Sequence, residues 1–339
     1  MQKKNYEQWK RDFVQRLEER IRQNLVLSYR GPVTIHVKRD INEIKREGII
    51  MPNLNSSGIS PAVYLEMLYM RYQLDEPEDA LVEEVLSVFT ANMDITVDRK
   101  VFFDYEQMKR HLRIRVNGAE NNADWLTEMV CEVKGDFIYS CYLHFTMKEK
   151  ECGIVNVRRE MASAWNVSEE EIIAEARKNE MAEPVELISL EGVINSYLEI
   201  GEEINLFDYP EEVSDNCIQF VLREANSPYG AAVLARDEVL KAAGELLQDD
   251  YYIMPSSIRE VILVPARFGD EMEFLDELVR EINLKGVEPQ EILSDHAQYY
   301  DRKLQLFMNA DEYRRMIKFT EEAVAEEPED EAFSPEQTM

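Results

Sequence analysis

Apolar residues recur at steps of three and four along several segments, a spacing that places them on one face of a helix. Such a stripe covers residues 6–25, and another covers 81–93 after Pro77. Ser168 and Glu171 form an S-x-x-E capping box, which predicts a helix beginning there and running toward Lys178. Further helices are predicted over 190–198, over 238–247, and from 270 onward with Phe274, Leu275, Leu278, Val279 and Ile282 facing the core.

Alternation of apolar and polar residues marks the predicted strands. Val33, Ile35 and Val37 alternate with a polar set that includes His36, so His36 is expected to point outward. The same alternation sets Leu112, Ile114 and Val116 against Arg113, Arg115 and Asn117. Further strands are predicted at 137–146 with an antiparallel neighbour at 153–158, at 219–223, and as a hairpin-like pair at 251–255 and 259–265. Residues 61–73 read as a buried helix or as a strand running into one.

Helices and strands interleave without the regular βαβ rhythm of a doubly wound fold, so the predicted class is α+β with mixed or antiparallel sheets. The length of 339 residues favours two lobes. We expect an N-terminal α+β lobe over 1–200 and a C-terminal α+β lobe over 201–305. Residues 306–339 are expected to form a helix that runs into a disordered acidic tail, because the last 19 residues contain eight acidic residues and no Lys or Arg.

The chain carries 68 Asp and Glu against 38 Lys and Arg, a formal net charge of −30, and 45% of its residues are hydrophobic. That hydrophobic content is typical of a globular protein with a packed core. The charge repels nucleic acid and anionic membranes, so neither direct nucleic-acid binding nor membrane binding is expected. A basic protein surface is the partner class that such a charge favours, and solubility alone is the alternative explanation.

Residues 1–50 differ from the rest in charge. They contain twelve basic and seven acidic residues, a balance of +5 that leaves −35 for the remainder. Two interpretations remain open: a helix with a solvated Lys and Arg face, or a basic arm for an acidic partner, which includes the acidic body of the protein itself.

The four cysteines, at 131, 141, 152 and 217, form no CxxC pair and are too few for a disulfide framework. The N-terminus lacks the apolar stretch of a signal peptide, and no window approaches 18 uncharged apolar residues. We therefore expect a reduced, cytoplasmic protein. A glycine-rich phosphate loop and an H-E-x-x-H motif are both missing, so no cofactor and no metal is predicted.

One cluster contains residue types that support nucleophilic catalysis. Ser256 and Ser257 follow Pro255 in a predicted turn, and Asp295 and His296 come later in the chain. A serine mechanism needs the imidazole within hydrogen-bond reach of the hydroxyl and a third group that orients the imidazole. Adjacent Asp295 and His296 do not easily bond each other, and serines after proline more often supply turn hydrogen bonds. These four residues are the set to test for catalysis.

Three stretches are distinctive enough to compare with known families: YYIMPSSIREVILVP (251–265), ILSDHAQYYD (292–301) and ISPAVYLEMLYMRYQ (59–73). In them the chain resembles an uncharacterised bacterial family, domain of unknown function 5688, and the resemblance extends from about residue 6 to 305. A weaker likeness over 235–264 is to the YtpQ-like proteins, domain of unknown function 1444. The resemblance implies a cytoplasmic bacterial protein and supplies no activity or catalytic residue.

Three functions follow from these observations, in order of preference. The first is a non-enzymatic binding or regulatory protein with a strongly acidic surface, because the signatures of catalysis are missing while the charge is extreme. The second is a hydrolase-like enzyme without a recognisable motif, which a concave pocket collecting the serine, aspartate and histidine groups would favour. The third is a polyanion mimic that occupies a DNA-binding protein. No oligomeric state is predicted.

Overall fold

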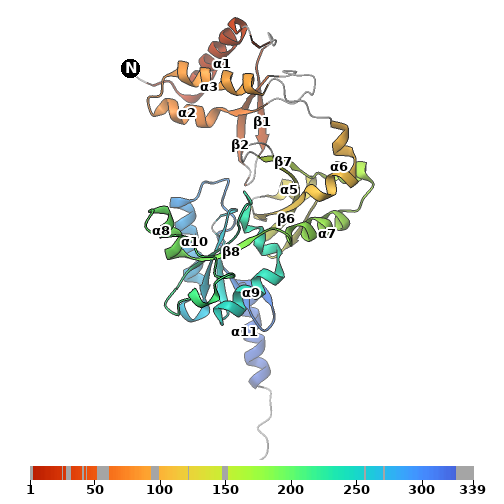
Figure 1. Ribbon diagram of the computed structural model, residues 1–339, viewed down its shortest axis with the longest axis vertical. Helices are drawn as coiled ribbons and strands as arrows, with labels where there is room; N and C mark the ends of the chain where they lie inside the picture. Colours follow the sequence, from red (N-terminus) through yellow and green to blue (C-terminus); the bar gives the residue numbers. More distant parts are fainter. Residues whose placement is uncertain are drawn as a thin grey trace, which may run out of the picture.

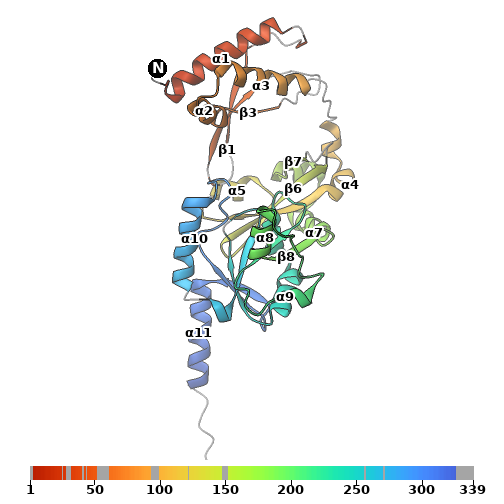
Figure 2. The same cartoon turned by 60° about the vertical axis from the view of Figure 1, so that its left-hand side comes forward.

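The computed structural model describes residues 3–24, 26–27, 32–39, 42, 44–51, 61–92, 99–120, 122–146, 152–255, 257–269 and 272–325. Within these ranges, three antiparallel sheets pack against helices, which confirms the predicted α+β class. Figure 1 and Figure 2 show the first sheet with its helices at one end of the molecule and α11 (Ala310–Ala325) projecting at the other.

The first sheet and three helices form the N-terminal part. Their bounds are α1 (Tyr6–Gln23), β1 (Thr34–Arg39), β2 (Lys45–Ile50), β3 (Val63–Tyr64), α2 (Leu65–Gln73) and α3 (Glu78–Ala91). The predicted stripe of α1 is confirmed, since Trp9, Phe13, Leu17 and Ile21 are fully buried. The segment 61–73 is a strand that runs into a helix, one of its two predicted forms. Leu25 and Met93, at the ends of two predicted stripes, lie outside the described residues.

The second sheet is built around β6, which pairs with β4 on one side and with β5 and then β7 on the other. Ser168 caps α7 by accepting the N–H of Glu171 at 3.2 Å, as the capping box predicted. The bounds are η2 (Arg99–Phe103), α4 (Tyr105–Met108), η3 (Lys109–His111), β4 (Leu112–Gly118), α5 (Ala123–Glu128), β5 (Cys131–Lys134), β6 (Phe137–Thr146), β7 (Cys152–Asn156), α6 (Arg159–Trp165) and α7 (Glu169–Glu180).

The third sheet has six strands in the order β13-β12-β10-β11-β9-β8. The bounds are β8 (Val185–Ser189), α8 (Leu190–Tyr197), η5 (Pro210–Glu212), β9 (Phe220–Glu224), η6 (Gly230–Ala235), α9 (Asp237–Leu247), β10 (Tyr251–Met254), β11 (Val261–Pro265), η7 (Ala266–Phe268), α10 (Met272–Gly286), β12 (Gln298–Asp301) and β13 (Leu306–Asn309). The predicted hairpin-like pair is confirmed as β10 and β11. Helix α10 packs on one face of this sheet, and α9, η6 and the second sheet share a core with its other face.

Two large cores divide the described chain. One extends from Trp9 to Phe89, and the other extends from Met108 to Phe307 and joins the second and third sheets. Strand β8 precedes the boundary predicted at residue 200 and β9 follows it, yet the two pair along their length. Strands β12 and β13 likewise pair across residue 305. The described cores separate between 89 and 108, and the two-lobe division remains a prediction.

Three side chains lie in environments opposite to those predicted. Val37 is 52% exposed because it lies in the part of the β1–β2 hairpin that continues beyond β3. Strand β3 pairs with β2 only at Gly48 and Ile49. Phe274 is 53% exposed because the buried stripe of α10 passes through Leu275 and Val279 instead. Arg115 is only 3% exposed, since the polar face of β4 is covered as well as its apolar face.

The basic face of α1 is neutralised within the chain. Lys10 lies 2.8 Å from Glu47 on β2, and Arg16 lies 3.4 Å from Glu78 and 3.1 Å from Asp79 at the start of α3. Glu78 and Asp79 occupy the N-terminus of α3, where the helix dipole also favours negative charge. Charge and apolar burial therefore act together in docking α1.

Candidate functional site

Asp295 and His296 line a pocket of about 400 Å³ where the three sheets meet, which we call the His296 pocket. Its wall consists of 118–120 after β4, 135–136 before β6, 292–296 before β12, and Asn42 between β1 and β2. Two of the four residues predicted for catalysis therefore lie in one concavity.

The two predicted serines are placed differently. Ser257 Oγ accepts the N–H of Arg259 at 3.0 Å, the turn hydrogen bond that was the alternative reading of the Ser-Ser pair. The N–H of Ser294 donates to Pro255 O at 3.1 Å, so the turn and the pocket segment are neighbours. Ser256 lies outside the described residues. The catalytic role of the four residues remains a prediction.

The imidazole of His296 is held by a carboxylate from α10. His296 Nδ1 lies 3.3 Å from Asp276 Oδ2, and Asp276 Oδ1 accepts the N–H of Ala297 at 2.7 Å. Arg280 Nη2 lies 3.8 Å from the same Asp276 oxygen. An oriented imidazole is thus present, and Asp276, not Asp295, supplies the orienting carboxylate. Asp276 lies in the amphipathic helix α10, twenty residues before His296, and no sequence motif marks it.

Asp295 and Asp136 are fixed by neutral amides. Asn283 Nδ2 donates to Asp295 Oδ1 at 2.8 Å and to Ser294 O at 2.9 Å. Gln298 Nε2 donates to Asp136 Oδ2 at 2.9 Å, and Asn309 Nδ2 donates to Asp136 Oδ1 at 3.0 Å. Both carboxylates are therefore held in fixed orientations at the pocket wall.

Asn42 connects the first sheet to this pocket. Its Nδ2 donates to Pro289 O at 2.8 Å and to Ile292 O at 2.9 Å. Its amide oxygen accepts from Asn122 Nδ2 at 2.9 Å, and its backbone N–H donates to Asn122 Oδ1 at 2.9 Å. Asn42 has φ of 59°, a left-handed conformation that Asn tolerates better than most residues. The pocket is thus assembled from parts of both cores.

The chemistry that the pocket supports is limited by its nucleophiles. Ser294 Oγ accepts the N–H of His296 at 3.1 Å, which points it at the backbone and not at the imidazole. Among the described residues, we find no hydroxyl or thiol hydrogen-bonded to the His296 ring. Within the same residues, His, Cys, Asp and Glu side chains do not gather in threes as a metal site requires.

A second feature is an exposed apolar surface around α8, which we call the α8 surface. Seven large apolar side chains are between 41% and 87% exposed there: Ile194, Tyr197, Leu198, Ile200, Ile204, Tyr209 and Ile218. The predicted helix over 190–198 is confirmed, but it buries none of its residues fully. Single exposed apolar residues are ordinary, whereas a large exposed apolar patch is typical of an interaction site.

The chain around the α8 surface is acidic. Residues 190–218 contain eight Asp and Glu and no Lys or Arg, and the sequence has no basic residue between Lys178 and Arg223. The segment is anchored to the sheet edge, because the N–H of Leu206 donates to Leu187 O at 2.8 Å and Asn205 bonds both Val185 and Leu187 of β8. The apolar side chains therefore sit on a fixed support.

Comparison with known proteins identifies the family. The model of the Family of unknown function (DUF5688) matches residues 10–302, which is most of the chain. The chain belongs to this family. No curated protein and no solved structure matches it significantly. No helix in the described residues combines the length and the apolar character needed to cross a bilayer.

The match to DUF5688 spans both features described above. It includes the pocket residues 118–136 and 292–296 and the whole of the α8 surface, and it ends before α11. Sequence reasoning missed Asp276 and the α8 surface. The surface had a signal in the sequence, since Ile and Tyr are interspersed with acidic residues over a long stretch that lacks any Lys or Arg.

Proposed function

We propose that this chain is a non-enzymatic binding protein whose α8 surface docks a basic, amphipathic segment of another protein. The observation that carries the proposal is the combination of seven exposed apolar side chains with eight acidic residues and no basic one in the same segment. A partner with apolar residues on one face and Lys or Arg at its margins complements both properties.

Apolar contact supplies most of the expected affinity. Burying a fully exposed Leu or Ile side chain contributes about 1.5–3 kcal/mol, so several such contacts are needed to exceed the cost of association. The carboxylates add faster association and selectivity for basic partners, and this part weakens with salt.

A second copy of the chain fits this surface poorly. Self-pairing through the same face would bring two segments with eight carboxylates each into contact, and like charges across an interface are unfavourable. A membrane surface is disfavoured for the same reason. The proposal therefore commits to a basic protein segment.

The test uses three synthetic helical peptides and isothermal titration calorimetry. One peptide has Leu on one face and Lys and Arg on the other, the second replaces the basic residues by Glu, and the third replaces Leu by Ser. We expect binding of the first peptide alone. The double variant Leu198→Gln/Ile200→Gln should weaken it about tenfold or more, which corresponds to ~1.4 kcal/mol.

Leu284→Gln is the matched control, because Leu284 is 87% exposed on α10 and does not belong to the 190–218 segment. It should leave affinity unchanged. Glu199→Gln/Glu202→Gln should slow association and reduce the salt dependence. Equal binding of the acidic peptide, or an equal loss in Leu284→Gln, would contradict the proposal, and peptide-independent dimers lost in Leu198→Gln/Ile200→Gln would assign the surface to self-association.

A reduced, cytoplasmic location in a bacterium belongs to the same proposal. Cys131, Cys141 and Cys217 are free thiols, as expected in a reducing compartment. Fractionation of cells that express the chain with a small epitope tag tests this location, and recovery in the medium or membrane fraction would contradict it.

Hydrolysis at the His296 pocket is the second candidate, favoured by the contact between His296 and Asp276. It requires Ser256 or Ser257 to reach the imidazole. Turnover of ester substrates that is lost in both His296→Ala and Ser256→Ala, with peptide binding intact, would support hydrolysis. Retention of any activity in both variants would remove it.

A further inference from the structure

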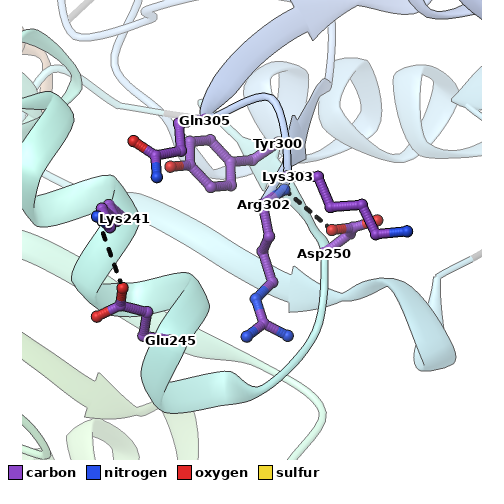
Figure 3. Close-up of a pocket in the computed structure, with 7 residues that line it drawn as sticks. All are labelled: Lys241, Glu245, Asp250, Tyr300, Arg302, Lys303 and Gln305. Atoms are coloured by element: carbon purple, nitrogen blue, oxygen red, sulfur yellow. Dashed lines mark hydrogen bonds and ion pairs between the residues drawn. The ribbon is translucent and has the colours of Figure 1, made fainter.

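A second pocket, of about 330 Å³, lies between α9 and the turn that joins β12 to β13. Lys241 and Glu245 from α9, Asp250 before β10, Tyr300 from β12, and Arg302, Lys303 and Gln305 from the turn line it (Figure 3). Three of these seven side chains are cations, in a chain whose net charge is −30. We call it the Tyr300 pocket.

Tyr300 ends in a buried donor without an acceptor. The residue is 2% exposed, and among the described residues its hydroxyl has no hydrogen-bond partner. Its ring stacks on Tyr251 at 4.7 Å between centroids, and the Tyr251 hydroxyl donates to Leu240 O at 2.8 Å. Buried polar groups are almost always hydrogen-bonded, so the exception at Tyr300 calls for a partner that comes from outside. Burial raises the pKa of Tyr300, and its hydroxyl remains a donor.

Arg302 and Lys303 give the pocket a positive balance, since its three cations face only two carboxylates, Asp250 and Glu245. Asp250 is already engaged, because its Oδ1 accepts the backbone N–H of Arg302 at 3.0 Å and its Oδ2 accepts from Tyr299 at 2.8 Å. Among the described residues, no carboxylate lies within ion-pair distance of the Arg302 or Lys303 side chain. Glu245 lies 3.8 Å from Lys241, which offsets its charge.

Gly244 makes room for the Arg302 side chain. A Cβ on Gly244 would lie 3.0 Å from Arg302 Cγ, tighter than most side-chain contacts, and 3.4 Å from Tyr251 Cε1, an ordinary contact. Glycine inside a helix is less favourable than alanine by about 1 kcal/mol, so Gly244 makes α9 less stable than alanine would. In Figure 3 the guanidinium extends away from Asp250, on the side of the pocket where Glu245 lies.

From these observations we propose that the Tyr300 pocket binds a small metabolite through an oxyanion, a phosphate or carboxylate group that pairs with Arg302 and that accepts the hydrogen bond of Tyr300. The planar guanidinium suits two oxygens of such a group at once. A volume of about 330 Å³ is at the lower end for ligand sites, which fits a ligand of metabolite size and excludes a polymer.

The proposal is independent of peptide docking at the α8 surface, because the two sites share no residue. The test titrates inorganic phosphate, methyl phosphate and acetate separately into the full chain by isothermal titration calorimetry. We expect at least one of them to bind with Kd of about 1 mM or tighter. Binding of the two phosphates alone assigns a phosphate ligand, acetate alone assigns a carboxylate ligand, and both assign the shared oxyanion.

Tyr300→Phe is the decisive variant, since it removes the hydroxyl and keeps the stacked ring. It should leave the melting temperature of the ligand-free protein unchanged and weaken anion binding about fivefold or more. Arg302→Gln should weaken binding further, whereas Arg11→Gln on α1 is the matched charge control and should have no effect. Tyr251→Phe loses a real hydrogen bond and should melt about 2–4 °C lower.

Two kinds of outcome would overturn the proposal. One is no binding of any of the three anions, or binding that Tyr300→Phe and Arg302→Gln leave unchanged. The other is a loss of melting temperature in ligand-free Tyr300→Phe equal to that in Tyr251→Phe, because the hydroxyl would then already have a structural partner.

Discussion

Arg115 illustrates how a single residue departs from its sequence pattern. Its guanidinium lies 4.8 Å from the ring centroids of both Trp125 and Tyr229, and it donates to Tyr229 Oη at 3.0 Å and to Asn156 Oδ1 at 3.1 Å. Alternation along β4 correctly assigned Arg115 to the face opposite Ile114. It could not show that other parts of the chain cover that face too.

Two glutamates are buried together where α7 meets β4 and β9. Glu180 Oε1 accepts the N–H of Ile114 at 2.5 Å, the Glu180 and Glu224 side chains are neighbours, and Arg236 Nη1 lies 3.9 Å from Glu224. Burial raises the pKa of Glu180 to about 7, and burial together with the neighbouring Glu180 raises that of Glu224 to about 9. The pair therefore shares a proton at neutral pH.

Glu224→Gln should make stability less dependent on pH. The folded pKa of Glu224 lies above its ordinary value of 4.5, so the native state binds more protons than the unfolded state and stability falls as pH rises toward about 9. The amide cannot ionise and can donate a hydrogen bond to the Glu180 carboxylate. Urea unfolding at a series of pH values should show the variant gaining on wild type with rising pH, by more than about 1.4 kcal/mol in total. Exposed Glu202→Gln is the control, and a parallel trend in both variants would contradict the shared proton.

Gln248 is a residue whose backbone conformation suits glycine. It ends α9 at the C-cap with φ of 54°, in the left-handed region where a Cβ is unfavourable. Gln248→Gly should raise the free energy of unfolding by about 0.5–1 kcal/mol. Chemical denaturation measures it, with Gln107→Gly within the regular helix α4 as a control that should destabilise instead.

At the scale of the element, α1 tests whether packing or charge fixes a helix. Trp9 is fully buried and stacks with Phe13 at 4.9 Å and with Tyr72 at 5.9 Å, whereas Lys3 pairs with an Asp75 that is 86% exposed. Trp9→Ala should cost about 3–5 kcal/mol, and reversing Lys3 and Lys4 together to Glu should cost far less, since exposed pairs contribute about 0–1 kcal/mol each. Denaturant unfolding compares the two. If α1 detached in high salt while Trp9→Ala left the free energy of unfolding unchanged, docking by apolar burial would be contradicted.

Elements with strong local signals could be predicted from the sequence. The cap at Ser168 placed α7, and the aromatic run at 137–146 matches β6 at both ends. Phe274 was assigned wrongly because two overlapping apolar stripes are possible on α10, and only the sheet beneath it selects the one through Leu275. Local pattern therefore determines the type of element, and tertiary contact determines its buried face.

The His296 pocket was only half predictable for the same reason. Asp295 and His296 are adjacent in the chain and were recognised by their chemistry. Asp276 contacts His296 from α10. Asp136 lines the pocket from just before β6, and Asn42 lines it from the segment between β1 and β2. These distances in sequence leave no local pattern, so only the fold reveals them.

At the scale of the whole molecule, charge follows the division into cores. Residues 1–92, which include the whole first core, hold 13 basic and 14 acidic residues, a balance of −1 that leaves −29 for the remainder. In the core from Trp9 to Phe89, cations of α1 face carboxylates of α3, as in the pair of Arg16 with Asp79. The part of the chain around the larger core carries most of the uncompensated negative charge. Repulsion between these charges destabilises its compact state.

Salt should therefore act oppositely on the two cores. Raising ionic strength from about 0.01 M to 0.15 M shortens the Debye length from about 30 Å to 8 Å, which screens repulsion across the larger core and weakens the ion pairs of α1 and α3. Hydrogen exchange should slow in β6 and β10 and stay constant or quicken in α3. Salting-out would slow exchange in both cores and is stronger for sulfate than for chloride. Replacing chloride by sulfate at equal ionic strength therefore separates salting-out from charge screening. Equal protection of α3 and β6 in chloride would contradict this account, because the two cores would then share one electrostatic response.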